Sequence, residues 1–432
     1  MKKPILSMPL LFLLALLAGC CTRQTSQIAI AGVNYPADAT EITVQKLDAE
    51  DYAVFSQFEN LEVLDISSVD ISFEAYEQLT SQLRDGITVR WSVPFNGAKM
   101  PSSSTELTLS GDISSEDARA IKYFSQLSRL TIRDAEVTEN LYTVIKTSTE
   151  MNPSLQLDCT ANIYGVSFDY ATELLNLNNI PIQSPDKLCL ALEIFPNIKT
   201  VEMCDCGLRN EIMQGLREEY PAIKFVWMIS FLKYKVRTDI QVFSTLAVNL
   251  NRPGNSTTFS PLFKYCTELR ALDLGHMAIT DISEITNLKK LHTLILADNR
   301  ISDISPLAEL KELEYIELFF NRISDISPLL ALPKLEDLNI CYNRRLKNPT
   351  DLTQCRTLKK LYISNCNLDQ NEIATLRSGL PEGCELNTTA GNAVYNAGWR
   401  TKKNPRNTKI REAFKNWRKV KEYPTWDNII YE

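Results

Sequence analysis

Residues 291–329 read LHTLILADNRISDISPLAELKELEYIELFFNRISDISPL and contain the string NRISDISPL twice, 22 residues apart. The spacing continues on both sides, in segments that start at Leu269, Leu291, Leu313, Leu335 and Leu358, at steps of 22, 22, 22 and 23 residues. Within a segment the first, fourth, sixth and eleventh positions are mostly apolar, and the strand positions between them alternate outward. This period predicts coils that stack around a shared hydrophobic spine.

The pattern L-x-x-L-x-L-x-x-N inside each period is typical of a leucine-rich repeat. It predicts an α/β fold, a horseshoe-shaped solenoid with a parallel β-sheet on its concave face. At the ninth position a buried side-chain amide satisfies backbone groups where the strand turns, which predicts a stacked ladder of Asn299, Asn321 and Asn343. Met277 and Cys366 replace Asn at the two ends, where we expect the ladder to fray.

A longer period of about 66 residues runs through the amino-terminal half. Its marks are Thr40-Glu41-Ile42, Thr105-Glu106-Leu107, Thr172-Glu173-Leu174 and Thr238-Asp239-Ile240, at steps of 65, 67 and 66 residues. Because such a unit divides into three coils, we interpret residues 28–248 as irregular leucine-rich-repeat-like units and residues 249–390 as the regular repeats. Outer helices are expected near residues 74–84 and 211–220, and hairpin turns at Gly97 and Gly165. The alternative for this half is a separate α/β domain, since it shows no Asn ladder.

Residues 1–20 have the features of a signal peptide, in which Lys2 and Lys3 precede an apolar stretch from Ile5 to Leu17. A transmembrane helix is the weaker interpretation, because a bilayer span needs roughly 20 apolar residues. Leu17-Ala18-Gly19-Cys20 resembles the lipobox of bacterial lipoproteins, which implies acylation of Cys20 with fatty acids such as palmitate. The resemblance implies a lipid anchor on the extracytoplasmic face of a bacterial cell membrane. The alternative is an ordinary secretory signal with a coincidental cysteine.

Composition narrows the classes of function. Removal of the predicted signal peptide, with Lys2 and Lys3, changes the formal net charge from −7 to −9. This negative charge disfavours nucleic acid as a partner. The chain has eleven cysteines, most of them inside strand or helix patterns, and we interpret these as buried thiols rather than disulfides. Cys204-Asp205-Cys206 is too little for a metal site, since His276 and His292 are the only imidazoles. We therefore expect no cofactor and no metal.

The carboxyl end is predicted to close the stack of coils. One coil buries apolar side chains worth on the order of 10 kcal/mol, whereas ordering its residues costs roughly 20 to 40 kcal/mol. Coils must therefore stack, and the ends need caps. Residues 391–432 are predicted to form a basic aromatic cap, in which Ile410, Phe414, Trp417 and Val420 recur at helical spacing. Residues 400–421 hold ten Lys or Arg and Glu412 as the sole acid, which suits a solvated face and also anionic lipid or wall polymer.

The string NRISDISPL resembles the short repeats of internalin-type bacterial leucine-rich-repeat proteins, over about residues 266–388. Together with the lipobox and with Gly398-Trp399-Arg400, the chain is similar to repeat-bearing surface lipoproteins of Gram-positive anaerobes. The resemblance implies display and protein recognition, and it carries no catalytic residues. The chain departs from internalins in its 66-residue units and in lacking a visible wall-sorting motif, which leaves host-cell recognition open.

Outward positions of the regular strands predict the binding surface. Since adjacent strands lie about 4.8 Å apart, neighbouring side chains on this concave face are expected to form one exposed patch, and exposed aromatic patches mark contact surfaces. The patch residues are Ile295, Tyr315, Phe319, Phe320, Tyr342 and Tyr362. They predict a monomeric module that binds an unknown protein or peptide ligand, unless the amino-terminal half folds across them.

Other functions have weaker support in the sequence. A wall-polymer or glycan binder would need hydrogen-bonding groups beside the aromatic residues, which Glu317, Asp337 and Asn339 offer. No G-x-S-x-G, H-E-x-x-H, Walker or dinucleotide motif is present, so we expect no enzyme. A Cys-dependent hydrolase using Cys341 and His276 is the remaining alternative.

Overall fold

The computed structural model describes residues 26–231, 234–245, 261–389 and 405–417. Its contacts divide the chain into two compact units, Met1–Tyr170 with Asp186–Pro196 and Ala171–Pro185 with Asn197–Glu432. Each unit is described by itself. The predicted signal peptide with Cys20, as well as Val420, lies outside the described residues.

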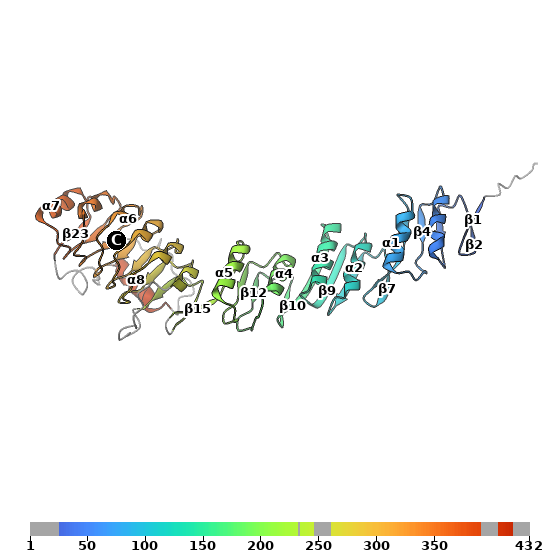
Figure 1. Cartoon of the computed structure of the whole chain (residues 1–432), viewed down its shortest axis with the longest axis horizontal. Helices are drawn as coiled ribbons and strands as arrows, with labels where there is room; N and C mark the ends of the chain where they lie inside the picture. The colour runs from blue at the N-terminus through green and yellow to red at the C-terminus, as the bar shows by residue number, and fades with distance from the viewer. Residues whose placement is uncertain (1–25, 232–233, 246–260, 390–404, 418–432) are drawn as a thin grey trace, which may run out of the picture. The chain divides into compact units, whose positions relative to one another are not determined.

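The first unit alternates β-hairpins with parallel sheets (Figure 1). Its strands are β1 (Gln27–Ile30), β2 (Val33–Pro36), β3 (Glu41–Thr43), β4 (Val63–Asp65), β5 (Thr88–Arg90), β6 (Ser92–Phe95), β7 (Ala98–Pro101), β8 (Glu106–Ser110), β9 (Arg129–Glu136), β10 (Gln156–Ile163) and β11 (Val166–Asp169). Strands β3-β4-β5 and β8-β9-β10 pair in parallel, whereas β1-β2, β6-β7 and β10-β11 are antiparallel hairpins. Three parallel strands thus follow each of the hairpins β1-β2 and β6-β7.

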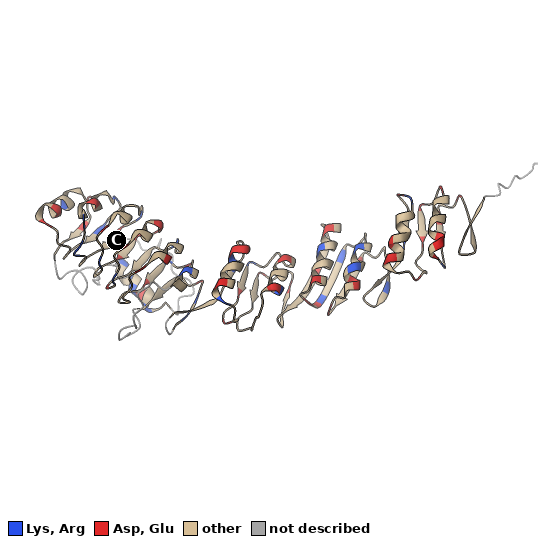
Figure 2. Cartoon of the chain, viewed as in Figure 1, with Lys and Arg blue, Asp and Glu red and all other residues tan. Residues whose placement is uncertain are grey.

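The helices of this unit are η1 (Ala49–Gln57), α1 (Phe73–Gln82), α2 (Ser115–Ala120), η2 (Ile121–Tyr123), α3 (Glu139–Met151) and α4 (Asp186–Ile194). The first five connect its parallel strands, and the last, α4, lies beyond β11 in the sequence. Side-chain oxygens of Ser72, Ser114 and Thr138 accept from the backbone N–H three residues on and so cap three of them. Figure 2 shows both signs of charge on these helices, where Glu74 and Glu77 of α1 pair with Arg119 and Lys122.

The predicted hairpin turns at Gly97 and Gly165 are confirmed. Both glycines have positive φ, 69° and 81°, and each follows a residue that is also left-handed. Backbone N–H groups of two turns are held by carboxylates of the following coil: Ala31 donates to Asp51 at 3.3 Å and Asn96 to Asp117 at 2.5 Å. The sequence marks stand at or just before the first strand after each hairpin.

The second unit starts with the parallel strands β12 (Leu174–Asn176), β13 (Thr200–Glu202) and β14 (Lys224–Val226), the helix α5 (Asn210–Glu219), and a hairpin of β15 (Met228–Phe231) and β16 (Tyr234–Arg237). A seven-stranded parallel sheet follows, in sequence order. It consists of β17 (Val242–Ser244), β18 (Ala271–Asp273), β19 (Thr293–Ile295), β20 (Tyr315–Glu317), β21 (Asp337–Asn339), β22 (Lys360–Tyr362) and β23 (Glu385–Asn387). The sheet thus starts one strand before the predicted boundary at residue 249.

The opposite wall of these regular coils is built from short turns of helix. These are η3 (Pro261–Tyr265), η4 (Ser283–Asn287), η5 (Ser305–Glu309), α6 (Ser327–Leu330), η6 (Pro349–Gln354) and α7 (Gln370–Gly379). Fourth-position residues such as Leu294, Ile316 and Leu338 are fully buried between this wall and the sheet. The regular coils are therefore the predicted solenoid, with one long parallel sheet and a shared apolar spine.

Strand pairing in the amino-terminal half differs from the simplest continuous solenoid. Among the described residues, strands β3-β4-β5, β8-β9-β10 and β12-β13-β14 belong to three separate sheets, none of which is hydrogen-bonded to the next. Each sheet ends where the chain leaves it to form a hairpin. The hairpins therefore interrupt the ladder that runs without a break through the regular coils.

Candidate functional site

Three asparagines at the ninth repeat position join successive coils. Asn321 is typical: its Oδ1 accepts from the backbone N–H of Ile301 at 3.0 Å, and its Nδ2 donates to the carbonyls of Leu296 and Leu318 at 2.9 and 3.0 Å. Asn299 and Asn343 repeat the arrangement one coil earlier and one coil later. All three side chains are buried, so each amide satisfies backbone groups that water does not reach.

Cys366 takes over the role of Asn at the carboxyl end. Its thiol lies 3.3 Å from the carbonyl oxygen of Ile340 and 3.5 Å from that of Ser364, the same two kinds of acceptor that the Asn amides use. A thiol is a weaker donor than an amide. This end of the ladder is therefore weakened rather than interrupted.

The eighth repeat position has a left-handed backbone in every regular coil. His276, Asp298, Phe320, Tyr342 and Asn365 have φ between 53° and 63°. This conformation is uncommon for residues other than glycine, and most uncommon for bulky side chains. It stores on the order of 1 to 3 kcal/mol at each position. We call this column of five residues the rim.

Neighbouring side chains of the rim contact one another. Nδ1 of His276 lies 2.7 Å from Oδ2 of Asp298. The rings of Phe320 and Tyr342 stack with centroids 4.0 Å apart and planes 11° apart, and the ring of Phe319 meets Phe320 edge-on. Phe320 is 43% exposed, one of the few large apolar side chains that the described surface shows. The rim thus presents a polar pair and an aromatic pair to solvent.

The six side chains predicted to form one open patch have different positions. Phe320 lies exposed and Tyr342 half-buried on the rim, whereas the other four are almost completely buried, at 1 to 5% exposure. These four are Ile295, Tyr315, Phe319 and Tyr362. The expectation of one continuous exposed patch must be corrected for them. Glu317, Asp337 and Asn339, the hydrogen-bonding groups expected to flank a glycan, are buried as well.

A helix near the carboxyl end lies across this face. It is α8 (Pro405–Lys415), and Figure 1 shows it on the strand side of the regular coils, away from α6 and α7. Asn407 in its first turn donates to the hydroxyl of Tyr315 on β20 at 2.9 Å. Trp417, just after the helix, packs against Phe243 of β17 with centroids 4.8 Å apart. An 11-residue helix extends about 16 Å, which matches the width of three to four strands.

Arg406 fixes the first turn of α8 to two neighbouring coils. Its guanidinium donates to Oε2 of Glu314 and to Oε2 of Glu336, both at 2.7 Å, and lies 3.7 Å from Oδ2 of Asp337. The Arg406 side chain is 3% exposed. A buried guanidinium needs such carboxylates, since an unpaired charge in this position would be strongly destabilising. We call Arg406 and these three acids the latch.

The surroundings of Glu314 favour its ionised form. Burial alone would raise the pKa of this carboxyl, but the hydrogen bond from His292 and the positive charges of Arg406, His292 and Lys334 outweigh burial. The pKa of Glu314 therefore lies below its ordinary value. The ionised carboxylate, which Arg406 requires, is the favoured form.

The predicted apolar stripe of the carboxyl-terminal segment is present, but its location differs from the expected one. Ile410, Phe414 and Trp417 are buried, as their helical spacing predicts. They lie on a helix that crosses the strand face of the coils and reaches β17, whereas we expected them to cover the last coil. The opposite face of α8 carries the exposed residues Lys409 and Arg411.

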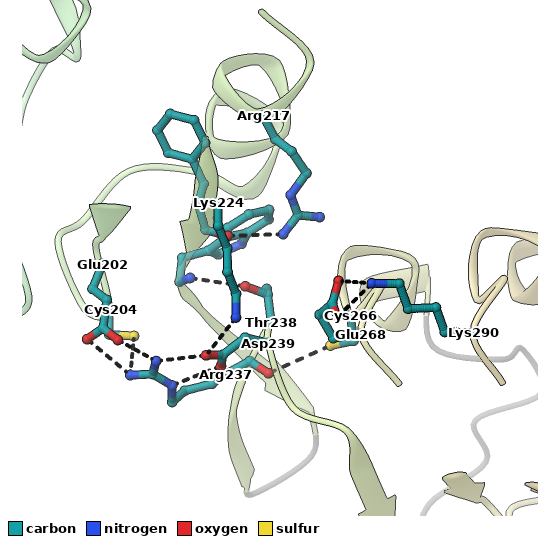
Figure 3. Close-up of polar contacts among 12 residues, drawn as sticks. Glu202, Cys204, Arg217, Lys224, Arg237, Thr238, Asp239, Cys266, Glu268 and Lys290 are labelled. Atoms are coloured by element: carbon teal, nitrogen blue, oxygen red, sulfur yellow. Dashed lines mark hydrogen bonds and ion pairs between the residues drawn. The ribbon is translucent and has the colours of Figure 1, made fainter. Parts of the chain in front are cut away.

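Sequence reasoning missed a polar junction at the start of the regular coils. Figure 3 shows Arg237, at the end of β16, between Glu202 and Asp239. Its guanidinium donates to Glu202 at 2.7 Å and to both Asp239 oxygens at 2.9 Å. Nearby, Arg217 of α5 stacks on the ring of Trp227 and donates to the carbonyl of Tyr265. These bonds join α5 and the hairpin to the first regular coil.

A surface hollow of about 320 Å³ lies beside this junction. Residues of α5, the following loop and the first regular coil line it, with Arg217, Lys224, Asp239 and Glu268 as its charged groups. Glu268 is paired with Lys290, and Asp239 with Arg237. Both carboxylates are thus paired with cations and Arg217 donates to backbone carbonyls, so we assign the hollow a structural role at the junction.

The cysteines of the described chain are free thiols. Burial raises the pKa of most of them, to about 12 for Cys159 and Cys366 and to about 11 for Cys204 and Cys355. Burial also raises the pKa of Cys341, in spite of hydrogen bonds from Ser364. Such thiols are poor nucleophiles. Cys341 and His276 also stand three coils apart, roughly 14 Å at strand spacing, so the two do not form a catalytic pair.

The described residues also offer neither a metal site nor a membrane-spanning helix. They contain no group of three or more His, Cys, Asp or Glu arranged to hold a metal ion. Within the same ranges no helix combines the length and the apolar character that crossing a bilayer requires.

The regular coils, with their parallel sheet and Asn ladder, have the leucine-rich-repeat fold. Residues 267–309 match the family model described as leucine rich repeats, two copies. No protein with a curated description is significantly similar to the sequence.

Several solved structures are similar to this chain. An internalin from Listeria monocytogenes is 19% identical over 68% of this chain and 85% of its own, with a TM-score of 0.29. A leucine-rich-repeat protein from Leptospira interrogans is 16% identical, and the match covers 82% of this chain and 96% of that protein, with a TM-score of 0.28. A plant peptide hormone receptor, RGFR1, in complex with RGF2, is 15% identical, and the match covers 80% of this chain and 54% of the receptor chain, with a TM-score of 0.23.

Proposed function

We propose that this chain is a membrane-anchored, extracytoplasmic recognition module that binds a protein or peptide ligand through its regular coils. The aromatic pair of the rim carries the proposal. Phe320 and Tyr342 are stacked and solvent-accessible, and both have a left-handed backbone that disfavours large side chains. Strained and exposed aromatic residues have no role in the apolar spine, and they are typical anchors of protein interfaces.

The anchoring part of the proposal depends on the sequence around Cys20. A signal peptide that ends in Leu-Ala-Gly-Cys supports acylation of this cysteine and retention on the outer face of the membrane. Incorporation of labelled palmitate into the wild-type chain, and its loss in Cys20→Ala, is the expected result. Palmitate label retained by Cys20→Ala would remove the anchor from the proposal.

A glycan or wall polymer is the second candidate ligand. The observation in its favour is the polar pair His276 and Asp298, which stands in the same rim as the aromatic pair and offers hydrogen bonds beside an exposed ring. Binding of purified wall polysaccharide by the soluble body, lost in Phe320→Ala, would favour this ligand over a protein.

The test compares capture of extracellular partners by variants of the soluble body, residues 22–432. Phe320→Ala combined with Tyr342→Ala is expected to abolish the capture that the wild type shows, with little change in melting temperature. Phe319 stays unchanged in this test, because its ring is buried and its loss would cost about 3 to 5 kcal/mol of stability. Leu174→Ala removes another exposed apolar side chain outside the rim and serves as the matched control. Equal capture by wild type and a folded rim variant would refute the proposed surface.

A further inference from the structure

The strand face beneath α8 combines acidic and polar side chains with the apolar and aromatic side chains of Ile295, Tyr315 and Phe319. Its outward positions include the buried acids Asp273, Glu317 and Asp337, as well as Thr293 and Asn339. The hydroxyl of Tyr315 donates to Glu317 at 2.5 Å, and Ser244 donates to Asp273 at 2.8 Å. A permanent core excludes such groups in favour of apolar ones. The composition is that of a recognition surface, and we call it the seat.

α8 matches the seat in charge and in shape. Arg406 supplies the cation that Glu314 and Glu336 require. Ile410, Phe414 and Trp417 follow at intervals of four, four and three residues and bury one stripe of the helix. A first-turn cation with apolar anchors along one face is the pattern by which an amphipathic helix binds a groove of another protein.

The regular coils do not depend on α8 for their own core. Leu294, Ile316 and Leu338 are buried on the side of the sheet that faces the convex wall. The parallel strand ladder is complete without any hydrogen bond from α8. Release of the helix therefore leaves the spine and the Asn ladder intact.

α8 depends on the seat for its own structure. An isolated helix shorter than about 12 to 15 residues is marginal in water, and α8 has 11 residues, several of them charged and exposed. Its helical form is thus coupled to docking. The helix folds when it binds and unfolds when it is displaced.

We propose that the seat is a receptor for a basic amphipathic helix and that α8 is the chain's own replaceable occupant. The partner presents a helix with Arg in its first turn and three apolar side chains four, eight and eleven residues further on. Displacement of α8 by this helix opens the strand face, which the chain otherwise blocks. This inference rests on the proposed recognition function and names the chemistry of the ligand.

The experiment uses a fluorescent peptide of residues 405–417 and the full-length chain in two forms. One is the wild type, and the other carries Arg406→Glu and Phe414→Ser, which undock its own α8. The peptide is expected to bind the undocked chain at least tenfold more tightly than the wild type, because the wild-type seat is occupied by a tethered competitor. A peptide with Glu in place of the arginine corresponding to Arg406 is the matched control and is expected to bind neither.

If the undocked chain is unstable, exchanging the charges of Glu336 and of the peptide residue that corresponds to Arg406 still tests the inference. Glu336→Arg in the seat is expected to weaken binding of the original peptide and to restore binding of the control peptide. Equal affinity of the original peptide for wild-type and undocked chains would overturn the inference, as would no binding to either. A wild-type dimer that exchanges α8 between two copies would also overturn it. None of these measurements involves the natural partner, so failure here leaves the rim proposal standing and can be told apart from a failure of that proposal in the capture test.

Discussion

Asn321 illustrates how one side chain joins two successive coils. Its amide contacts backbone groups of Leu296, Ile301 and Leu318, all buried. Asn321→Ala leaves these donors and acceptors without a partner in a place that water does not reach. We expect a loss of about 3 kcal/mol in the free energy of unfolding of this unit, since each unsatisfied buried group costs about 1 to 3 kcal/mol.

Urea unfolding followed by far-ultraviolet circular dichroism measures that loss. Asn287→Ala is the control, because Asn287 is exposed and its side chain makes one long hydrogen bond within its own turn. The control is expected to stay within about 0.5 kcal/mol of the wild type. Similar losses in the two variants would show that position nine has no special role.

For single residues, the sequence predicted those features that recur with the 22-residue period. The identity of Asn299, Asn321 and Asn343 at one repeat position is sufficient to infer their shared environment. The left-handed backbone at position eight was not predicted, because Phe320 and Tyr342 are residue types that rarely adopt it. Strand alternation predicted that Tyr315 and Ile295 are exposed. Alternation shows only that a side chain points away from the apolar spine, and it does not show that another element, here α8, covers that side chain.

Among the elements, a hairpin turn favours glycine because of its left-handed backbone, whereas a helix disfavours glycine. Gly97 stands in the turn between β6 and β7 with φ of 69°, whereas Gly215 lies within α5 on its exposed side. An added Cβ meets no atom within 4 Å at either position, so only backbone preference differs. We expect Gly97→Ala to destabilise its unit by about 1 to 2 kcal/mol and Gly215→Ala to stabilise its own by about 0.5 to 1 kcal/mol.

Thermal unfolding of both variants tests this contrast between elements. Each substitution serves as the control for the other, since the same methyl group is added in open space. A drop in melting temperature in both variants, or in neither, would contradict the assignment of Gly97 to a hairpin turn and Gly215 to a helix.

Docking of the element α8 is expected to depend on pH through the latch. In the docked state the pKa of Glu314 lies below its ordinary value of 4.5, because the hydrogen bond from His292 and the positive charges of Arg406, His292 and Lys334 outweigh burial. The stabilisation from ionised Glu314 is therefore complete above pH 4.5 and is lost as the pH falls through the lower, docked pKa. Below that point Arg406 loses one of its two close anionic partners, and α8 is expected to leave the seat.

Fluorescence of Trp417 reports this step. The difference between the spectra of wild type and Trp417→Phe isolates its signal, which is expected to shift to the red below pH 4.5, before circular dichroism shows that the strands unfold. Glu314→Gln is the control and is expected to reduce the pH dependence. A Trp417 signal that changes together with global unfolding would argue against a separate docking step.

Element boundaries were largely predictable, whereas connections between elements were not. The helices expected near residues 74–84 and 211–220 are α1 and α5, because amphipathic spacing is local information. Interruption of the ladder at each hairpin depends on long-range strand pairing, which the 66-residue period does not specify. The junction formed by Arg237, Glu202 and Asp239 joins residues up to 37 positions apart and left no recognisable pattern.

For the whole molecule, the apolar stripe of α8 predicted a buried helix face without saying where that face binds. Glu314 and Glu336 lie one coil apart, and Asp337 follows Glu336 directly. All three face Arg406, which precedes the apolar stripe of α8 by four residues. This complementarity of charge was the signal that the sequence contained. Recognising it required the strand register, which brings the acids together beside one another.

Hydrogen exchange followed by mass spectrometry tests the central claim, that α8 occupies the strand face of the regular coils. In the wild-type chain at neutral pH, the amides of residues 408–415 are expected to be protected, although a free helix of this length would not be. In Arg406→Glu this protection is expected to disappear while β18 to β21 keep theirs. Unprotected amides of α8 in the wild type would contradict the account, as would loss of protection in the strands together with the helix.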